Sequence, residues 1–350
     1  MKKTAVYLVI LGFFVMGGIL LWKFFPSKAV SPSVVMPAKA SDPGVSEKFM
    51  NEPIQPIPLS VRLDEKKVAL GRRLFSDARL SRNGTVSCAT CHDLNKGGTD
   101  RLPVSHGMDD ALGELNAPTV FNSGFNFKQF WDGRADTLED QAEGPLHNSK
   151  EMDAPGWPDL VARLSSDPAY AASFRSIYPE QGVTADTVKS AIAEFERSLI
   201  TPNSRFDRYL RGDEGAISDP EKEGYRLFKD LGCVVCHQGV NVGGNMFQTF
   251  GKFGDYFADR GNIKKVDYGR MNVTGLERDR YKFKVPSLRN IELTYPYFHD
   301  GTAETLEKAV QVMAKYQLGA ELPQNEVDAI TAYLKTLTGE YEGRPLGKQE

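Results

Sequence analysis

Two short motifs contain all four cysteines of the chain, and each motif ends in a histidine. They read CATCH (88–92) and CVVCH (233–237). The pattern C-x-x-C-H is the attachment signature of a c-type haem. Two thiols one helical turn apart can each add across one haem vinyl group, and the adjacent imidazole then reaches the iron from the same side. The sequence therefore predicts two covalent haems, held by Cys88, Cys91, Cys233 and Cys236, with His92 and His237 as the proximal iron ligands.

Paired cysteines have three other common uses. A zinc site binds C-x-x-C pairs as thiolates, and a redox dithiol uses one such pair near a βαβ pattern. An exported chain could also form two disulfides. None of these uses needs a histidine directly after both pairs, so the spacing favours haem.

The sixth position of each haem iron has several candidate ligands. Beyond the two motifs, the chain has only His106, His147 and His299. His106 is the best placed of these, because it follows the first motif closely and a glycine neighbour makes a mobile loop plausible. For the second haem Met313 is a candidate, and a thioether ligand would raise the reduction potential of that haem. Met313 also falls on an apolar helical face, so packing in the core is the alternative.

Two further residues could take part in chemistry beside the haems. Glu151 could act as a distal carboxylate, although one acidic residue among 46 more often lies on a solvated face. Trp131 lies in QFWDGR (129–134), directly before a turn-forming Asp-Gly pair. A tryptophan in such a place is usually buried in a core. The haem motifs on either side favour a second interpretation, in which Trp131 is an aromatic bridge between the haems.

The elements that position these residues are repeated in the chain. The segments LGRRLF (70–75) and EGYRLF (223–228) precede the two haem motifs and share a Gly-x-x-Leu-Phe core. A repeated unit of this kind indicates a duplicated fold. The sequence thus predicts a mainly α protein with two cytochrome-c-like helical domains, over residues 59–210 and 211–340, each built around one c-type haem.

Apolar residues at helical spacing mark three helices between and after the motifs. One stripe runs over 188–199, with Thr184 as a plausible N-cap and Pro202 after its end. A second runs over 306–313 and is expected to begin at Thr302. A third runs over 327–337 and is expected to stop at Gly339. Alternating patterns typical of strands are rare.

The N-terminal region predicts export. Residues 4–22 carry no charge, and Lys2 and Lys3 precede them. A run of about 18 or more uncharged residues is long enough to span a bilayer, so we expect residues 1–25 to be a membrane anchor or a signal sequence. The positive flank places the rest of the chain in the periplasm, anchored to the inner membrane. Residues 26–58 are rich in Pro, Ser and Ala and predict an extended tether.

Composition excludes one class of partner. The 350 residues carry a net charge of −3, and 41% of them are apolar. Without a basic patch or a block of like charges, we expect no nucleic-acid binding.

Several further segments carry a family resemblance. They are LFSDARLSRNGTVSCATCH (74–92), NAPTVFN (116–122), QFWDGRAD (129–136), SRFDRYL (204–210), GCVVCHQGVNVGGN (232–245), PSLRNIELTYPYFHDG (286–301) and QLGAEL (317–322). In this order and spacing, the chain from about Leu59 to Gly339 resembles the bacterial di-haem cytochrome c peroxidases, a family that also includes the MauG enzymes. The combination is highly specific and covers nearly the whole body of the chain.

The resemblance implies a role for each matching residue. His106 would be the distal ligand that closes the N-terminal haem in the resting form, and Met313 the second axial ligand of the C-terminal haem. Gln141 and Glu151 would be catalytic groups at the peroxide site, and Trp131 would lie between the haems. A calcium ion between the domains would be held by three further residues, the last two through backbone carbonyls: Asn116, Thr294 and Pro296. Oxygen ligands of this kind suit Ca²⁺.

The implied reaction is the reduction of hydrogen peroxide to water. Electrons would come from a small cytochrome c or copper protein, or a quinol-linked donor, and pass from the C-terminal haem by way of Trp131 to the N-terminal haem. Two alternatives are a non-catalytic di-haem electron carrier and a MauG-like enzyme that oxidises a partner protein. MauG-like enzymes have tyrosine at the position of Met313, which favours the peroxidase. A homodimer is common in the family.

Overall fold

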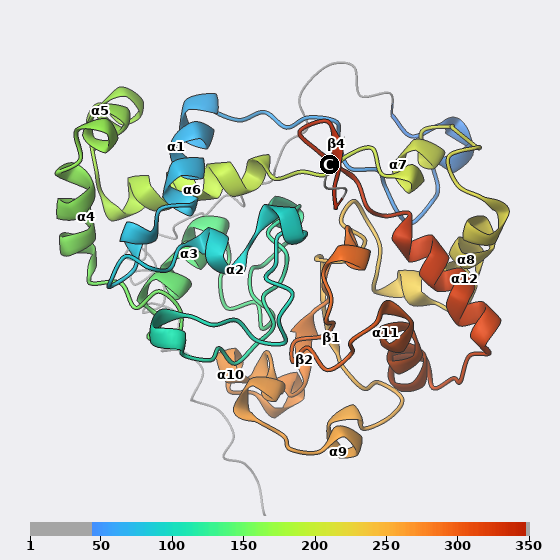
Figure 1. Cartoon of the computed structure of the whole chain (residues 1–350). Coiled ribbons are helices and arrows are strands. Elements are labelled where there is room, and N and C mark those ends of the chain that lie inside the picture. The colour runs from blue at the N-terminus through green and yellow to red at the C-terminus, as the bar shows by residue number, and fades with distance from the viewer. Residues whose placement is uncertain (1–43, 348–350) are drawn as a thin grey trace, which may run out of the picture. The chain divides into compact units, whose positions relative to one another are not determined.

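The computed structural model describes residues 44–347, and these residues form a mainly helical body (Figure 1). The α-helices are α1 (Glu65–Phe75), α2 (Cys88–Cys91), α3 (Leu138–His147), α4 (Trp157–Ser165), α5 (Pro168–Ile177), α6 (Ala185–Ser198), α7 (Arg205–Leu210), α8 (Asp219–Asp230), α9 (Tyr256–Arg260), α10 (Met271–Thr274), α11 (Leu306–Met313) and α12 (Gln324–Lys335). Two short antiparallel pairs join β1 (Phe247–Thr249) to β2 (Lys282–Lys284) and β3 (Glu340–Tyr341) to β4 (Arg344–Pro345). The predicted mainly α class is confirmed.

The two predicted domains, residues 59–210 and 211–340, are here called the first and second half. In each half, the glycine of the repeated Gly-x-x-Leu-Phe core lies at a crossing of two helices. In the first half α1 crosses α6, and in the second α8 packs against α12 (Figure 1). A Cβ atom on Gly71 would lie 1.9 Å from the carbonyl oxygen of Ala191, and one on Gly224 would lie 1.9 Å from that of Ala329. Only a residue without a side chain allows the two backbones to approach so closely. The repeat in the sequence therefore corresponds to a repeated helix contact.

Each half has its own apolar core. Leu74, Phe75 and the apolar face of α6 form the first core, against which Cys88 packs. Phe228, Tyr333 and their neighbours form the second core, against which Cys233 packs. A smaller aromatic cluster joins the β1–β2 pair to the segment after α11, and it consists of Phe250, Tyr256, Phe257, Phe283 and Tyr316. Two haem motifs on two separate cores agree with the predicted pair of cytochrome-c-like units.

The predicted helix boundaries hold at one of the three stripes. The side chain of Thr184 accepts a hydrogen bond from the backbone of Thr187 and caps α6, as expected. The second stripe begins later than expected, because Thr305 rather than Thr302 caps α11. The third helix, α12, ends at Lys335, before the expected stop at Gly339. Capping depends on backbone dihedrals, which apolar spacing does not fix.

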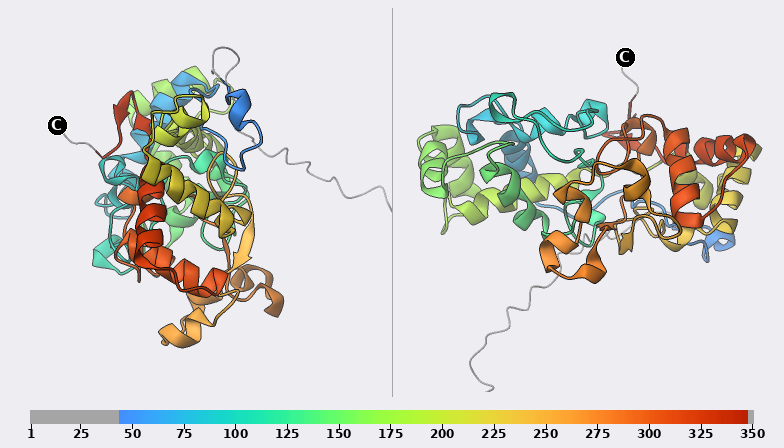
Figure 2. Two further views of the ribbon diagram at one scale, coloured as in Figure 1. Left: turned by 90° about the vertical axis from the view of Figure 1, so that its right-hand side faces the viewer. Right: turned by 90° about the horizontal axis from the view of Figure 1, so that it is seen from below.

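The predicted tether is shorter than expected, because packing begins before Leu59. The described part of residues 26–58 includes the buried side chains of Phe49, Ile54 and Ile57. Glu52 in this segment accepts a hydrogen bond from the hydroxyl of Tyr225 and pairs with the ammonium of Lys229 at 3.1 Å. The segment, blue in Figure 2, thus lies beside α8 of the second half. Three scattered apolar residues in a Pro-rich stretch give no periodic signal, which is why the sequence did not predict this packing.

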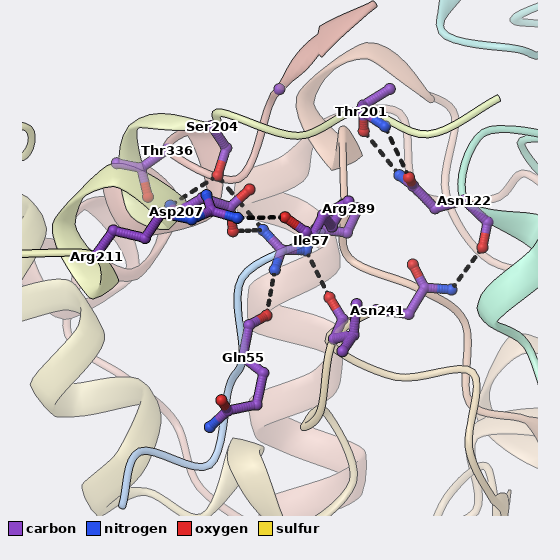
Figure 3. A network of polar contacts seen from close by, with 12 residues as sticks. Gln55, Ile57, Asn122, Thr201, Ser204, Asp207, Arg211, Asn241, Arg289 and Thr336 are labelled. Atoms are coloured by element: carbon purple, nitrogen blue, oxygen red, sulfur yellow. Dashed lines mark hydrogen bonds and ion pairs between the residues drawn. The ribbon is translucent and has the colours of Figure 1, made fainter. Parts of the chain in front are cut away.

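A buried polar network fastens this segment to the second half (Figure 3). The guanidinium of Arg289 forms an ion pair with Asp207 at 2.7 Å, and both side chains are fully buried. Arg289 also donates to the carbonyl of Gln55 at 2.8 Å, and Arg211 donates to that of Ile57 at 2.6 Å. The bonds to these two carbonyls hold residues 55–57 in place. The ion pair that fixes Arg289 is costly to break, because removing one partner would leave an uncompensated buried charge.

The expected membrane span at residues 4–22 lies outside the described residues. Within residues 44–347, every helix is too short or too polar to cross a bilayer.

Candidate functional site

Both predicted proximal histidines are held in the same way. The Nδ1 atom of His92 donates to the carbonyl of Gly98 at 3.2 Å, and that of His237 donates to the carbonyl of Val242 at 3.2 Å. A carbonyl can only accept, so each ring keeps its proton on Nδ1 and leaves Nε2 free as a ligand. Burial lowers the pKa of His92 and lowers that of His237 to about 4. Both rings are therefore neutral, as iron ligation requires.

A large cavity lies beside the second haem motif. Its volume is about 620 Å³, within the usual range for cofactor sites. Cys233, Cys236 and His237 line it, and Met313 lines it as well. Apart from two lysines and a few neutral polar groups, the lining is apolar, which suits the macrocycle of a haem. The residues present therefore fit a covalent haem with His237 and Met313 as candidate axial ligands.

The cysteines are available for haem attachment. None of the four forms a disulfide, and Cys88 packs against the first core whereas Cys233 packs against the second. The pairs therefore cannot combine into one four-cysteine zinc site. Burial raises the pKa of Cys88 to about 12 and that of Cys233 to about 11, so these thiols are protonated at neutral pH.

Glu151 is a half-buried acid near the first haem motif. Burial raises the pKa of its carboxyl group, and a 2.7 Å hydrogen bond from the side chain of Asn148 partly offsets that effect. Burial is the main reason that the pKa values of Cys88 and Cys91 are raised, and the charge of Glu151 adds to the shift of both thiols, so the carboxylate lies near them. Gln141 lies half-buried on α3, the helix that leads into this segment. Glu151 is therefore not on a solvated face.

His106 lies on a loop that packs against the segment of Glu151. The backbone amide of Met108 donates to the carbonyl of Glu151 at 2.8 Å. The Nδ1 atom of His106 lies 2.5 Å from a carboxylate oxygen of Asp110, and the His106 side chain is 46% exposed. In this conformation a surface carboxylate holds His106. Asp109 and Asp110 both adopt positive φ angles, so the loop carries local backbone strain.

The other two histidines have structural partners. The Nε2 atom of His299 lies 2.8 Å from a carboxylate oxygen of Asp267, and both side chains are buried. His147 pairs with Glu143 at 3.4 Å. All three histidines outside the haem motifs therefore have a carboxylate partner, and the partner of His106, Asp110, is the most exposed of the three carboxylates.

Trp131 joins the first half to the cavity of the second. Its indole Nε1 donates to the carbonyl of Asn116 at 2.9 Å, and its own carbonyl accepts from the backbone amide of Lys284 at 2.8 Å. Trp131 and Asn116 both line the cavity that contains His237. The position suits the predicted bridge between the haems.

The turn after Trp131 is held from both sides. Gly133 adopts a positive φ of 66°, and the guanidinium of Arg270 donates to the carbonyls of Asp132 and Gly133 at 3.1 and 2.7 Å. Arg134 pairs with Asp132 at 3.0 Å and lies over the ring of Phe130. The Asp-Gly turn therefore fixes the direction of the preceding indole.

The three residues matched to a calcium ion face one region. Asn116, Thr294 and Pro296 all line the large cavity. The Nδ2 atom of Asn116 donates to the carbonyl of Leu102 at 2.8 Å, which turns its Oδ1 atom away from that bond. Within residues 44–347, no hydrogen bond uses this oxygen or the carbonyl oxygens of Thr294 and Pro296 as an acceptor. Free oxygen atoms of this kind suit Ca²⁺.

Two residues of the site were not predicted from the sequence. Asn148 donates to the carboxylate of Glu151 and orients it, and the only sign of this in the sequence is that the two residues are close along the chain. Lys284 is a buried lysine on β2 that lines the large cavity. Lysine is usually exposed, so nothing in the sequence marked this one as buried.

Comparison with known proteins agrees with this arrangement. Residues 65–215 match the family model of di-haem cytochrome c peroxidase, and residues 221–338 match that of cytochrome c. The chain is 52% identical to the cytochrome c peroxidase Ccp of Escherichia coli (strain K12), over 83% of this chain and 62% of that protein, so it spans less than two thirds of that relative. It is 49% identical to the cytochrome c551 peroxidase of Nitrosomonas europaea, over 83% of this chain and 85% of that one.

A solved structure shares the fold over most of both chains. It is the crystal structure of a MauG-like protein associated with microbial copper homeostasis, with a TM-score of 0.71 and 31% identity, covering 87% of this chain and 96% of that one. With two haem motifs on two helical units and these relatives, the chain belongs to the di-haem cytochrome c peroxidase family.

Proposed function

We propose that this protein reduces hydrogen peroxide to two waters, using two electrons and two protons. When bound, the haems would store the electrons and give peroxide an iron centre at which to react. Electrons would enter on the side of His237 and leave by way of Trp131 for the side of His92. The single observation that carries the proposal is the half-buried carboxyl group of Glu151 near Cys88 and Cys91, on a segment against which the His106 loop packs.

Glu151 would move the proton of the reaction. A carboxylate in a partly buried site can accept a proton from one peroxide oxygen and return it to the departing oxygen. Burial raises the pKa of Glu151 toward the range in which it can do both. The amide of Asn148 holds one carboxylate oxygen at 2.7 Å and thereby orients the group. Gln141, half-buried on the preceding helix, would orient peroxide by hydrogen bonding.

Met313 supports a peroxidase over a MauG-like oxidation of a partner protein. The residue lines the cavity of His237 and directly precedes a π-helical turn, Ala314–Leu318. Such turns often occur at functional sites. If Met313 and His237 both held the iron of a haem in this cavity, the thioether would raise the potential of that haem and favour its reduced state, as an electron-accepting centre requires.

His106 would gate the site of peroxide. A ligand from His106 would close the first iron in the resting protein, and the conformation in which Asp110 holds His106 would leave it open. Reduction on the His237 side, with calcium at Asn116, Thr294 and Pro296, would shift the population toward the open loop.

The proposed cell compartment, electron donor and assembly are based on the N-terminal sequence and on the family. We place the protein in the periplasm, anchored by residues 4–22, with a small cytochrome c, a copper protein or a quinol-linked partner as the donor. A homodimer is the expected assembly.

The experiment is a peroxide turnover assay on the di-haem protein with calcium and a reduced cytochrome c. One peroxide should disappear for every two donor molecules oxidised. A protein that exchanges electrons with the donor but consumes no peroxide would instead be an electron carrier.

A further inference from the structure

Lys284 is a buried cation without a protein counter-charge. Its residue is 7% exposed, and burial alone lowers the pKa of its ammonium group to about 8. Within residues 44–347, no carboxylate or other side chain forms an ion pair or hydrogen bond with this ammonium group. An unpaired buried charge is costly, and proteins normally pair it. A negative charge from a bound group is therefore expected beside Lys284.

The residues that line the cavity around Lys284 indicate what kind of group could bind there. Among the described residues that line it, two are lysines, Lys284 inside and Lys252 at an exposed position, and none is aspartate or glutamate. An apolar cavity with cations and no anion fits a ligand that is apolar in its body and anionic at its edge. A haem has this form, because its macrocycle carries two propionates. The cavity also contains Cys233 and Cys236, the attachment points of the second haem.

The backbone of Lys284 is tied to Trp131. The amide of Lys284 donates to the carbonyl of Trp131 at 2.8 Å. Lys284 is also paired with Phe247 across the β1–β2 ladder, so its position relative to the indole is fixed twice. A group that Lys284 binds is thereby held in register with Trp131.

We propose that Lys284 is a positioning residue that binds a propionate of the second haem and holds that edge of the haem against Trp131. The pair would neutralise the buried ammonium group. Its positive charge would also favour the reduced iron, since reduction adds an electron nearby. For charges about 10 Å apart at an effective dielectric constant of about 20, the interaction changes the reduction equilibrium by roughly tenfold.

The test measures the potentials of both haems in the di-haem protein by spectroelectrochemistry. Lys284→Gln and Lys284→Met should lower the midpoint potential of the second haem alone, by roughly tenfold in equilibrium constant or about 59 mV for one electron. Lys284→Arg, which keeps the charge, should restore most of the potential. The propionate bending mode of the second haem, seen by resonance Raman spectroscopy, should shift in the neutral variants only.

Lys282→Gln is the matched control. Lys282 lies on the same strand but pairs with Asp279 at 3.0 Å outside the cavity, so its loss should leave both potentials unchanged. An unaltered potential in Lys284→Gln, or an equal shift in Lys284→Arg, would overturn the proposal. If the neutral variants lose the second haem, as counted per chain, retention in Lys284→Arg supports the ion pair and loss in Lys284→Arg refutes it.

Discussion

The indole nitrogen of Trp131 donates a 2.9 Å hydrogen bond to the backbone carbonyl of Asn116. The backbone amide of Asn116 donates to the backbone carbonyl of His299 at 2.8 Å, and the ring of His299 pairs with the carboxylate of Asp267. Asn116, in the loop after the first haem motif, is therefore bonded to the indole on one side and to the buried His299–Asp267 pair on the other. The indole that lines the cavity of the second haem motif is thus fixed to the loop that follows the first motif.

Trp131→Phe should slow electron transfer between the haems while both remain attached. Phenylalanine keeps an aromatic ring but cannot donate to the carbonyl of Asn116. Stopped-flow absorption of the half-reduced protein mixed with peroxide measures the rate. Trp157→Phe, which removes a tryptophan bonded to Glu143 away from the cavity, should leave that rate unchanged. An unaltered rate in Trp131→Phe would show that the indole is structural only.

Glu151→Gln should retain both haems and lose about 10²–10⁴-fold in turnover, the usual contribution of a general acid–base group. Burial raises the pKa of Glu151, so its basic form is populated only above the ordinary carboxyl range. Turnover of the unaltered protein should therefore fall as the pH falls through that raised pKa, and the glutamine variant should lack this dependence. Glu143→Gln is the control, because Glu143 pairs with Lys189 at the surface. Comparable activity in both variants would exclude Glu151 as the proton carrier.

His106→Ala should remove the need for pre-reduction. Without the imidazole, the first iron has no ligand from this loop, so the oxidised protein should react with peroxide at once. Absorption spectra before and after one-electron reduction should then show the same coordination of the first haem, whereas the unaltered protein should change. His147→Ala, which removes a histidine paired with Glu143, should behave as the unaltered protein does. A persistent lag in His106→Ala would contradict the gate.

Gly71→Ala and Gly224→Ala should each destabilise the fold by about 3 kcal/mol or more, because a new Cβ would meet a carbonyl oxygen at 1.9 Å and force the helices apart. Denaturant unfolding and the yield of di-haem protein measure the effect. Gly215→Ala is the control, since its Cβ would meet only a side-chain oxygen of Asp213 at 3.7 Å. An equally small loss in all three variants would mean that the crossings yield easily.

Much of the fold could be predicted from local patterns. The three apolar stripes correspond to α6, α11 and α12, because helical spacing alone determines which face is buried. Helix ends were less accurate, as the shift of the cap from Thr302 to Thr305 shows. The packing of Phe49 and Ile54 was not predicted, since their burial depends on a surface formed by residues far along the chain.

The sequence by itself determined the number of haem sites, their thiol and histidine anchors, and the duplication, because these depend on spacing within a few residues. Only the tertiary structure decided that Glu151 is half-buried near Cys88, that Asp110 holds His106, and that Lys284 lines the second cavity without a counter-charge. Burial and charge balance arise from segments distant in the chain, so no local pattern contains them.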